Sequence, residues 1–252
     1  MSSSIWTRCA GDSELRPLHL SPWRVVESQH QVSTRKLVDS ADEQALLEEL
    51  IDSAKPPDLT GGRMHYLLFT PFRYPPLRHG SRFGKRHERG IWYGSLERRT
   101  AFAEVAYYRL LFLEGSSAQL GTLTTPLTAF RASLRTDSGV ALEAPPFDAF
   151  HGIIASPVSY SGTQALAAEL RQAGVEAFSY PSARDIDEGV NVAAFTPKVF
   201  GRSRPTSLES WHCAASRERV DVTRSDYFRR ETFAFARQQF LVDGQLPNPG
   251  TD

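Results

Sequence analysis

The hydrophobic positions of this chain follow two different spacings, which predict helices in some segments and strands in others. Apolar residues recur at helical spacing at about residues 40–53, 96–113 and 161–173, and Gly174 is well placed to follow the end of the third helix. The first twenty residues, rich in serine and charge, are predicted to form a loosely held arm. Short apolar runs bounded by turn residues predict strands at 23–26, 65–70, 91–93, 127–132, 140–143, 175–178 and 190–195.

The order of these elements indicates the fold class. Strands outnumber helices and do not alternate regularly with them, so we expect an α+β fold with a mixed β core and surrounding helices. The tail from residue 202 onward is predicted to add strands and a helix or edge segment. A length of 252 residues favours one domain over 1–252.

Composition excludes several classes of protein. The chain has 29 Lys and Arg and 29 Asp and Glu, so no overall charge attracts it to nucleic acid or a membrane. Its two cysteines lie far apart, and it has no signal-like leader and no 18-residue apolar run, so we expect a cytoplasmic protein with no membrane span. His79 and His87 lack the i, i+4 spacing of a helical zinc site, and we expect no metal.

The segment between Arg73 and Arg109 carries a local excess of positive charge. Guanidinium groups match two phosphate oxygens at once, so the cluster suits a phosphate-bearing ligand. The alternative is a solvated basic surface. The segment contains three glutamates, at 88, 97 and 104, against nine basic residues, at 73, 78, 82, 85, 86, 89, 98, 99 and 109.

Glu104 stands out because its predicted helix is apolar on nearly every face. Its neighbours three and four residues away are Thr100, Ala101, Tyr107 and Tyr108, so no cation on the same helix can pair with it. A carboxylate in such a helix needs a partner from another element or a ligand. The alternatives are a position at the solvent edge and a bond to a structural arginine.

The loop at residues 179–185, between two predicted strands, offers hydroxyl groups, a guanidinium and turn-type backbone amides to a polar ligand. The alternative is that it only turns the chain. The sequence has no Gly-x-Ser-x-Gly, P-loop or Gly-x-Gly-x-x-Gly motif, which removes the commonest hydrolase and nucleotide-binding signatures.

Four separated motifs together resemble the RES domain, which is named for an arginine, a glutamate and a serine. They are a turn at residues 80–84, a strand end at 93–95, an Ala-x-x-Glu helix at 101–104, and a Pro-Ser-Ala-Arg loop at 181–184 before a Val-Asn-x-Ala strand at 190–193. The resemblance covers about residues 60–200, with N-terminal and C-terminal extensions outside it. Ser, Phe and Gly at 81, 83 and 84 replace the Gly, Trp and Asn of the commoner turn.

The resemblance implies an architecture similar to the ADP-ribosyltransferase toxins and an enzyme that breaks the nicotinamide–ribose bond of NAD⁺. Such an enzyme degrades NAD⁺ as a glycohydrolase or phosphorylase, or transfers ADP-ribose to a target. NAD⁺ is the substrate, and no further cofactor is expected. The resemblance also implies a toxin–antitoxin system with an Xre-like antitoxin as partner, a possible homo-oligomer in that complex, and nucleic acid reached only through the antitoxin.

The resemblance assigns the site to Arg82, Glu104 and Ser182, with Tyr93 as a further member and Arg73-Tyr74 as a less secure match. We expect Glu104 to hold the ribose and stabilise positive charge, because glycosidic cleavage passes through an oxocarbenium-like state. Arg82, with Arg73, would bind the pyrophosphate. Tyr93 or Tyr74 would stack on nicotinamide, and Ser182 would hydrogen-bond ribose or phosphate.

Two hypotheses from other classes remain open at this point. One is a nucleic-acid-binding module that uses the Arg73–Arg109 segment, with Phe72, Tyr74, Phe83 and Trp92 as stacking groups. The other is a regulatory protein that binds NAD⁺ without turnover.

Overall fold

The computed structural model describes residues 4–28, 38–54, 62–74, 80–226 and 230–249. Its helices are α1 (Ile5–Arg8), α2 (Ala41–Ala54), α3 (Tyr66–Arg73), α4 (Arg98–Glu114), α5 (His151–Ile154) and α6 (Ser161–Gln172). Its strands are β1 (Arg16–Leu20), β2 (Trp23–Glu27), β3 (Trp92–Ser95), β4 (Leu123–Arg131), β5 (Leu134–Ala141), β6 (Ala177–Pro181), β7 (Val190–Ala194), β8 (Ser207–Ala215), β9 (Arg219–Arg224) and β10 (Thr232–Ala236).

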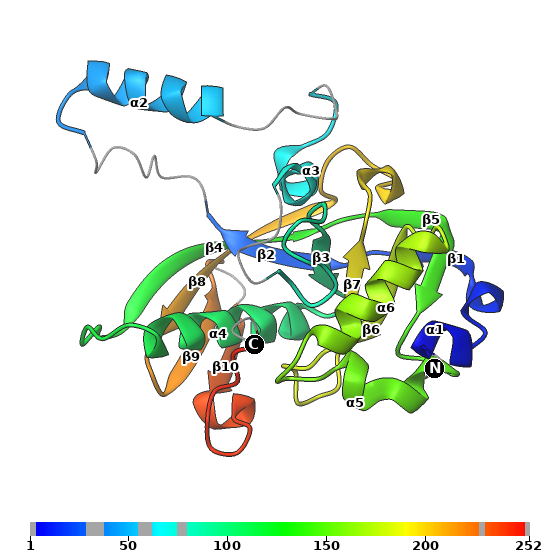
Figure 1. Cartoon of the computed structure of the whole chain (residues 1–252). Coiled ribbons are helices and arrows are strands. Elements are labelled where there is room, and N and C mark those ends of the chain that lie inside the picture. Colours follow the sequence, from blue (N-terminus) through cyan, green and yellow to red (C-terminus); the bar gives the residue numbers. More distant parts are fainter. Residues whose placement is uncertain (1–3, 29–37, 55–61, 75–79, 227–229, 250–252) are drawn as a thin grey trace.

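The ten strands form one mixed sheet in the order β1-β5-β6-β7-β3-β2-β4-β8-β9-β10 (Figure 1). The β5–β6 pair is parallel and the other pairs are antiparallel. The predicted α+β class is therefore confirmed. No helix in the described residues is long and apolar enough to cross a membrane.

The sheet opens between β2 and β3, near its middle. These two strands share a single register pair, Trp23 with Ser95, whereas β2 pairs with β4 along its whole length. Gly94 is required at the junction, since a Cβ there would lie 2.7 Å from the Trp23 carbonyl oxygen and 2.6 Å from the Trp92 ring. The strands diverge beyond this point, and the opening becomes a cavity.

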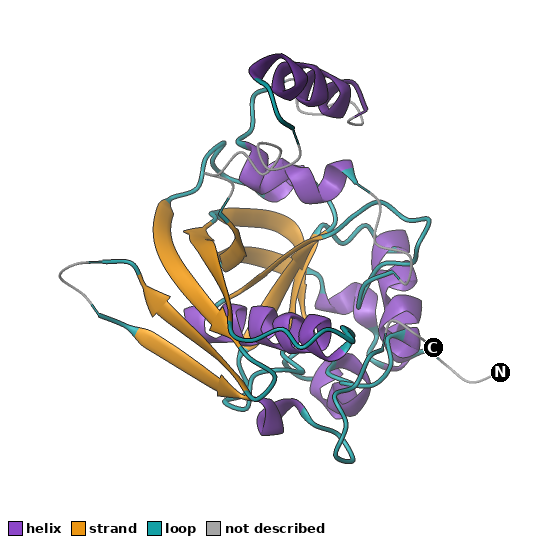
Figure 2. Cartoon of the chain, turned by 90° about the vertical axis from the view of Figure 1, so that its left-hand side faces the viewer, coloured by secondary structure: helices purple, strands orange, loops and turns teal. Residues whose placement is uncertain are grey.

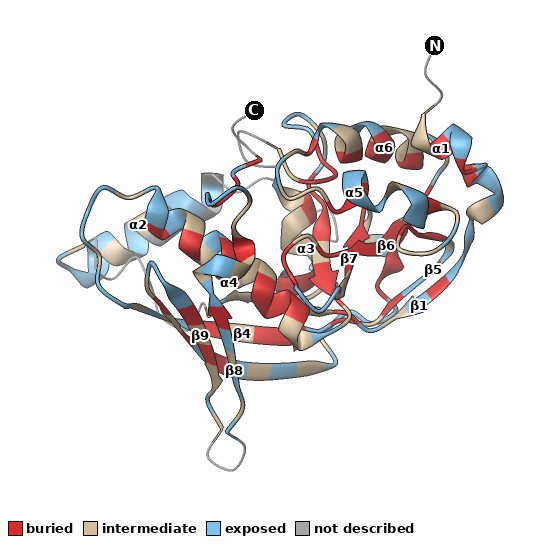
Figure 3. Ribbon diagram, turned by 90° about the horizontal axis from the view of Figure 1, so that it is seen from below, coloured by how far each residue is buried: buried red, intermediate tan, exposed pale blue. Residues whose placement is uncertain are grey.

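Helices cover both faces of the curved sheet (Figure 2). Because alternate strand residues point to opposite faces, Ala193 of β7 packs beneath α6 with Leu166, whereas Val192 packs beneath α3 with Leu68. The longest helix, α4, packs on the strands that end the chain and buries Phe102, among other residues, against them. Figure 3 shows buried residues gathered on the strands and on the sheet-facing sides of α4 and α6, while α2 is largely exposed.

The predicted strand at 65–70 is wrong, because residues 66–73 form α3. His65 caps the helix, and its Nδ1 accepts a hydrogen bond from the backbone N–H of Leu67. The helix buries Leu67, Leu68 and Phe72 against the sheet and contains Pro71 near its end. Tertiary packing of one apolar face therefore outweighs the strand propensity of the sequence and the usual effect of proline.

The predicted loose arm at residues 1–20 is also wrong over its described part. Trp6 of α1 is 8% exposed and stacks on Phe147 at 5.8 Å between ring centroids. Strand β1 follows and pairs with β5 at the edge of the sheet. The N-terminal segment therefore contributes to the core, which its Ser-rich composition conceals.

The other predicted elements are confirmed with small shifts in their ends, except for the strand at 140–143, which overlaps only the end of β5 (Leu134–Ala141). These are the helices at 40–53, 96–113 and 161–173, the remaining strands, and the strands of the tail. Gly174 has a φ of +75° directly beyond α6, as expected for a residue that ends a helix.

Candidate active site

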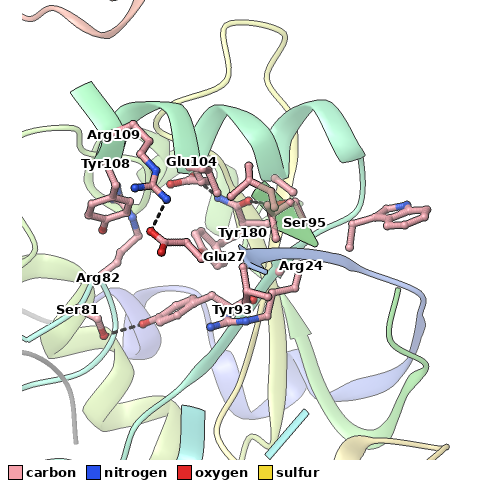
Figure 4. A pocket seen from close by; sticks show the side chains of 18 of the residues that line it. Arg24, Glu27, Ser81, Arg82, Tyr93, Ser95, Glu104, Tyr108, Arg109 and Tyr180 are labelled. Carbon is pink, nitrogen blue, oxygen red and sulfur yellow. Dashed lines mark hydrogen bonds and ion pairs between the residues drawn. The ribbon is translucent and has the colours of Figure 1, made fainter. Parts of the chain in front are cut away.

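A cavity of about 650 Å³ opens where β2 and β3 diverge, beneath α4. Its walls come from β2, the turn at residues 81–82, β3, α4 and the ends of β6 and β7. In the close-up, the labelled α4 side chains lie above the cavity, and Tyr93 and Arg24 lie below it (Figure 4). The polar groups on its walls are Arg24, Glu27, Ser81, Arg82, Tyr93, Ser95, Glu104, Tyr108, Arg109, Tyr160, Tyr180 and Asn191.

The unusual composition of α4 follows from its two contacting faces. Residues 101, 104, 105, 108, 109 and 112 line the cavity, and their spacing places them on one side of a helix. Residues 102, 103, 106, 107, 110 and 113 pack into the core on the other side. The helix carries apolar residues on both sides because one face meets the sheet and the other meets a cavity beside exposed Tyr108 and Phe112.

Glu104 is held in the cavity by two neutral hydrogen-bond donors. Its Oε1 accepts hydrogen bonds from Ser182 Oγ at 2.9 Å and from Asn191 Nδ2 at 2.6 Å. Asn191 is oriented in turn, since its Oδ1 accepts a hydrogen bond from Ser95 Oγ at 2.6 Å. No described residue donates to Oε2 or forms an ion pair with Glu104. The alternative in which Glu104 pairs with a structural arginine therefore has no support among the described residues.

Ser182 begins a short loop that is fastened at both ends. Its Oγ also accepts hydrogen bonds from the backbone N–H groups of Arg184 and Asp185, at 3.1 and 3.2 Å. Asp185 accepts a hydrogen bond from Thr100 Oγ1 at 2.8 Å, which ties the loop to the first turn of α4. The loop therefore sets the position of the Ser182 hydroxyl group relative to Glu104, beyond merely turning the chain.

Tyr93 lines the cavity with its ring and uses its hydroxyl group to fix the neighbouring turn. The hydroxyl oxygen lies 2.9 Å from Ser81 Oγ and accepts a hydrogen bond from the Phe83 N–H at 3.2 Å. Burial raises the pKa of Tyr93 to about 12 and that of Tyr180 well above its usual value, so both phenols stay neutral near pH 7.

Arg82 lines the same cavity but is partly committed to the protein. Its Nη1 donates to the carbonyl oxygens of Ile154 and Ser156, at 3.2 and 2.8 Å, and its guanidinium lies over the Tyr160 ring. The structure thus brings Arg82, Tyr93 and Glu104 to one cavity and Ser182 into contact with Glu104. Arg73 and Tyr74, at the end of α3, are not among the residues that line it.

Acidic partners from outside the basic segment neutralise much of its charge. Arg98 pairs with Glu209 and Glu231, and Arg99 pairs with Asp185. The ion pair between Arg109 of α4 and Glu27 of β2 lies at the cavity itself (Figure 4). Lys85, Arg86 and Arg89 are exposed, and Arg78 and His79 lie outside the described residues. The described part of the segment therefore consists mainly of structural ion pairs and surface charges, with few of its described cations directed into the cavity.

Three of the four stacking groups required by the nucleic-acid hypothesis are buried. Phe72, Phe83 and Trp92 are at most 5% exposed, whereas Tyr74 is 39% exposed. Phe83 packs edge-on against Phe178 and Tyr180. Of these four side chains, Tyr74 alone presents a ring on the surface, which weakens the support for that hypothesis.

Sequence reasoning missed several residues of the cavity. Asn191 was recognised only as part of a motif, although a single amide within an apolar predicted strand was a usable signal. Arg24, a single charge within an apolar strand, was a second signal. Arg109 was counted only as part of the basic segment. No group of three or more His, Cys, Asp or Glu in the described part of the chain is arranged to hold a metal ion.

Comparison with known proteins gives one positive result. Residues 56–216 match the family model of the RES domain, so the match covers more than half of the chain and contains the principal cavity residues on β3, α4 and β7. No curated protein matches the chain.

Proposed function

The chain belongs to the RES domain family, and on that premise we propose that its cavity binds NAD⁺ and that Glu104 promotes cleavage of the nicotinamide–ribose bond. The proposal rests mainly on how the two oxygens of the Glu104 carboxylate are hydrogen-bonded. Two neutral donors fix Oε1, and Oε2 receives no hydrogen bond from a described residue. A carboxylate that is fixed at one oxygen and available at the other is suited to a ligand hydroxyl group.

The chemistry of the bond explains why a fixed carboxylate helps. Cleavage builds positive charge on the ribose ring, in an oxocarbenium-like transition state. Nicotinamide leaves as a neutral molecule from a cationic ring, so the reaction needs no strong general acid. Glu104 would accept a hydrogen bond from a ribose hydroxyl group and stabilise the developing charge without reorganising, because Ser182 and Asn191 already hold it.

The shape and lining of the cavity suit a ligand of this kind. A volume of about 650 Å³ lies in the range of small-molecule sites. The ring of Tyr93 is held by the bonds of its hydroxyl group and offers a flat surface for stacking nicotinamide. Arg82 would contribute to binding the pyrophosphate, through donors other than the Nη1 bonds to the backbone.

Ser182 acts in this proposal as a positioning residue. Its hydroxyl group donates to Glu104 and accepts from two backbone N–H groups. No histidine lines the cavity beside it, so the described residues offer no histidine base to activate it as a nucleophile.

The resemblance extends the proposal to the biological role. We infer a toxin whose activity is held in check by an Xre-like antitoxin that covers the cavity, with nucleic acid contacted through the antitoxin. A homo-oligomer within that complex belongs to the same proposal.

The products formed from NAD⁺ test the proposed reaction directly. Purified protein is incubated with NAD⁺, with and without inorganic phosphate and an unrelated protein mixture, and every product is identified by mass. Release of nicotinamide is the expected result. ADP-ribose identifies water as the acceptor, a phosphorylated ADP-ribose identifies phosphate, and a mass increase on protein identifies a side chain. Intact NAD⁺ after incubation with an equimolar amount of folded protein contradicts the proposal.

A further inference from the structure

We propose that Arg24 of β2 binds a phosphate group of the substrate, in addition to Arg82. The proposal rests on the proposed function, because it names the contact that would hold the charged part of NAD⁺. The family resemblance gives no role to this residue, which lies outside the matched range of 56–216.

Arg24 lies where β2 separates from β3 and lines the cavity opposite α4 (Figure 4). Its Nη1 donates to the backbone carbonyl of Tyr93 at 2.6 Å, and its guanidinium lies 5.6 Å from the centre of the Trp92 ring. The Nε atom is buried and has no hydrogen-bond partner. The group is therefore enclosed on one side by protein and open to the cavity on the other.

Arg24 has fewer protein partners than the other two arginines of the cavity, since it makes one hydrogen bond to a carbonyl oxygen and its buried Nε makes none. Arg109 pairs with Glu27, and Arg82 is anchored by two carbonyl oxygens. Among the described residues, no carboxylate forms an ion pair with Arg24. Burial lowers its pKa to about 10, which leaves the group charged near pH 7.

A partly buried guanidinium with an unpartnered Nε and no counter-charge is costly to keep, and an anionic ligand would reduce that cost. Phosphate oxygens match the guanidinium fork in charge and geometry. With Glu104 on α4 as the ribose contact, the two residues would place the substrate across the cavity, from β2 to α4.

The test uses three substrates that share the scissile bond and differ in phosphate: NAD⁺, nicotinamide mononucleotide and nicotinamide riboside. Nicotinamide release is measured for the wild type, Arg24→Gln, Arg24→Lys and the control Arg135→Gln, which alters an exposed arginine on β5. Melting temperatures are taken on the same preparations. We expect Arg24→Gln to lower kcat/KM for NAD⁺ by about ten- to a hundredfold and to change that for the riboside less than about threefold.

The outcomes separate the possible roles. An equal loss on all three substrates, or no loss on NAD⁺, overturns the assignment, because a structural role does not distinguish substrates by phosphate. Arg24→Lys should retain part of the selectivity, since it keeps a charge but loses the fork. If inorganic phosphate competes with NAD⁺ for the wild type but not for Arg24→Gln, the Arg24 site binds the substrate's own phosphate. If inorganic phosphate accelerates cleavage of the riboside by the wild type but not by Arg24→Gln, the Arg24 site binds free phosphate instead.

A binding experiment distinguishes failure of this assignment from failure of the proposed function. ADP-ribose and pyrophosphate are titrated into the wild type and Arg24→Gln by calorimetry. If the wild type releases no nicotinamide but binds these probes in an Arg24-dependent manner, the phosphate site stands and the proposed reaction fails. If the wild type cleaves NAD⁺ and Arg24→Gln binds the probes equally well, the reaction stands and the phosphate site fails.

Discussion

Asn191 on β7 donates a hydrogen bond from Nδ2 to Oε1 of Glu104 on α4, at 2.6 Å, across 87 positions of sequence. An ionised carboxylate only accepts hydrogen bonds, so the amide must present its nitrogen to Glu104. The bond from Ser95 to Asn191 Oδ1 fixes that orientation. The middle of the sheet therefore positions the carboxylate that is proposed to act on NAD⁺.

Asn191→Asp tests this positioning with a change of almost no volume. Two carboxylates within hydrogen-bond distance cannot both ionise readily, so one of them retains a proton near pH 7. We expect kcat for nicotinamide release to fall by about tenfold or more, with a smaller change in KM. Wild-type kcat in folded Asn191→Asp would show that the orientation of Glu104 is unimportant.

Gly189 closes the loop that begins at Ser182, and an alanine there has no room. Its Cβ would lie 2.1 Å from Thr100 Oγ1 and 2.7 Å from Asp185 Oδ2, the two atoms that bind the loop to α4. We expect Gly189→Ala to lower the free energy of unfolding by about 2 kcal/mol or more, measured by urea unfolding. Gly152→Ala in α5 is the matched control, because its Cβ meets nothing within 4 Å. Equal stability of the two variants would contradict the described loop contacts.

Tyr93 makes stability depend on alkaline pH. Its pKa is about 12 in the folded protein and near 10 in an unfolded chain. Between these values the unfolded chain loses the proton and the folded one keeps it, so this residue's contribution to stability is present below pH 10 and falls as pH rises. The loss is at most about 1.4 kcal/mol per pH unit.

Tyr93→Phe is therefore expected to be less stable than the wild type near pH 8, because it loses the bonds to Ser81 and Phe83. The difference should shrink between pH 10 and 11. Urea unfolding at several pH values measures it. A difference that stays constant with pH would show that Tyr93 titrates normally in the folded protein.

The toxin role predicts an effect on cells. Expression of the wild-type chain alone should lower cellular NAD⁺ and stop growth, and co-expression of a cognate antitoxin should reverse both. Glu104→Gln at the same soluble level is the control and should be harmless. Normal growth and unchanged NAD⁺ with soluble wild-type protein would contradict the toxin role.

The sequence predicted the parts of the fold in which local pattern and tertiary packing agree. The helices α4 and α6 and most strands have periodic apolar positions that also face the core, whereas α2 forms with Leu46 and Leu50 exposed. The predicted convergence of Arg82, Tyr93, Glu104 and Ser182 came from motif order, and the structure brings these residues together at one cavity and its edge.

The errors arose where non-local contacts decide the conformation. The 65–70 segment has strand propensity, but packing of α3 against the sheet makes it helical. Trp6 looks unremarkable within a Ser-rich segment, yet it stacks on Phe147, 141 positions later. Arg24 reaches the cavity only because β2 separates from β3, and no local pattern encodes that opening.

The rate of nicotinamide release by folded Glu104→Gln protein is the decisive test of the proposed role of Glu104. The glutamine oxygen can still accept the bonds from Ser182 and Asn191, so only the negative charge is lost. We expect an unchanged fold, little change in NAD⁺ affinity, and turnover lower by about a hundredfold or more, equivalent to about 2.7 kcal/mol of transition-state stabilisation. Turnover equal to that of the wild type in the folded variant would contradict this role.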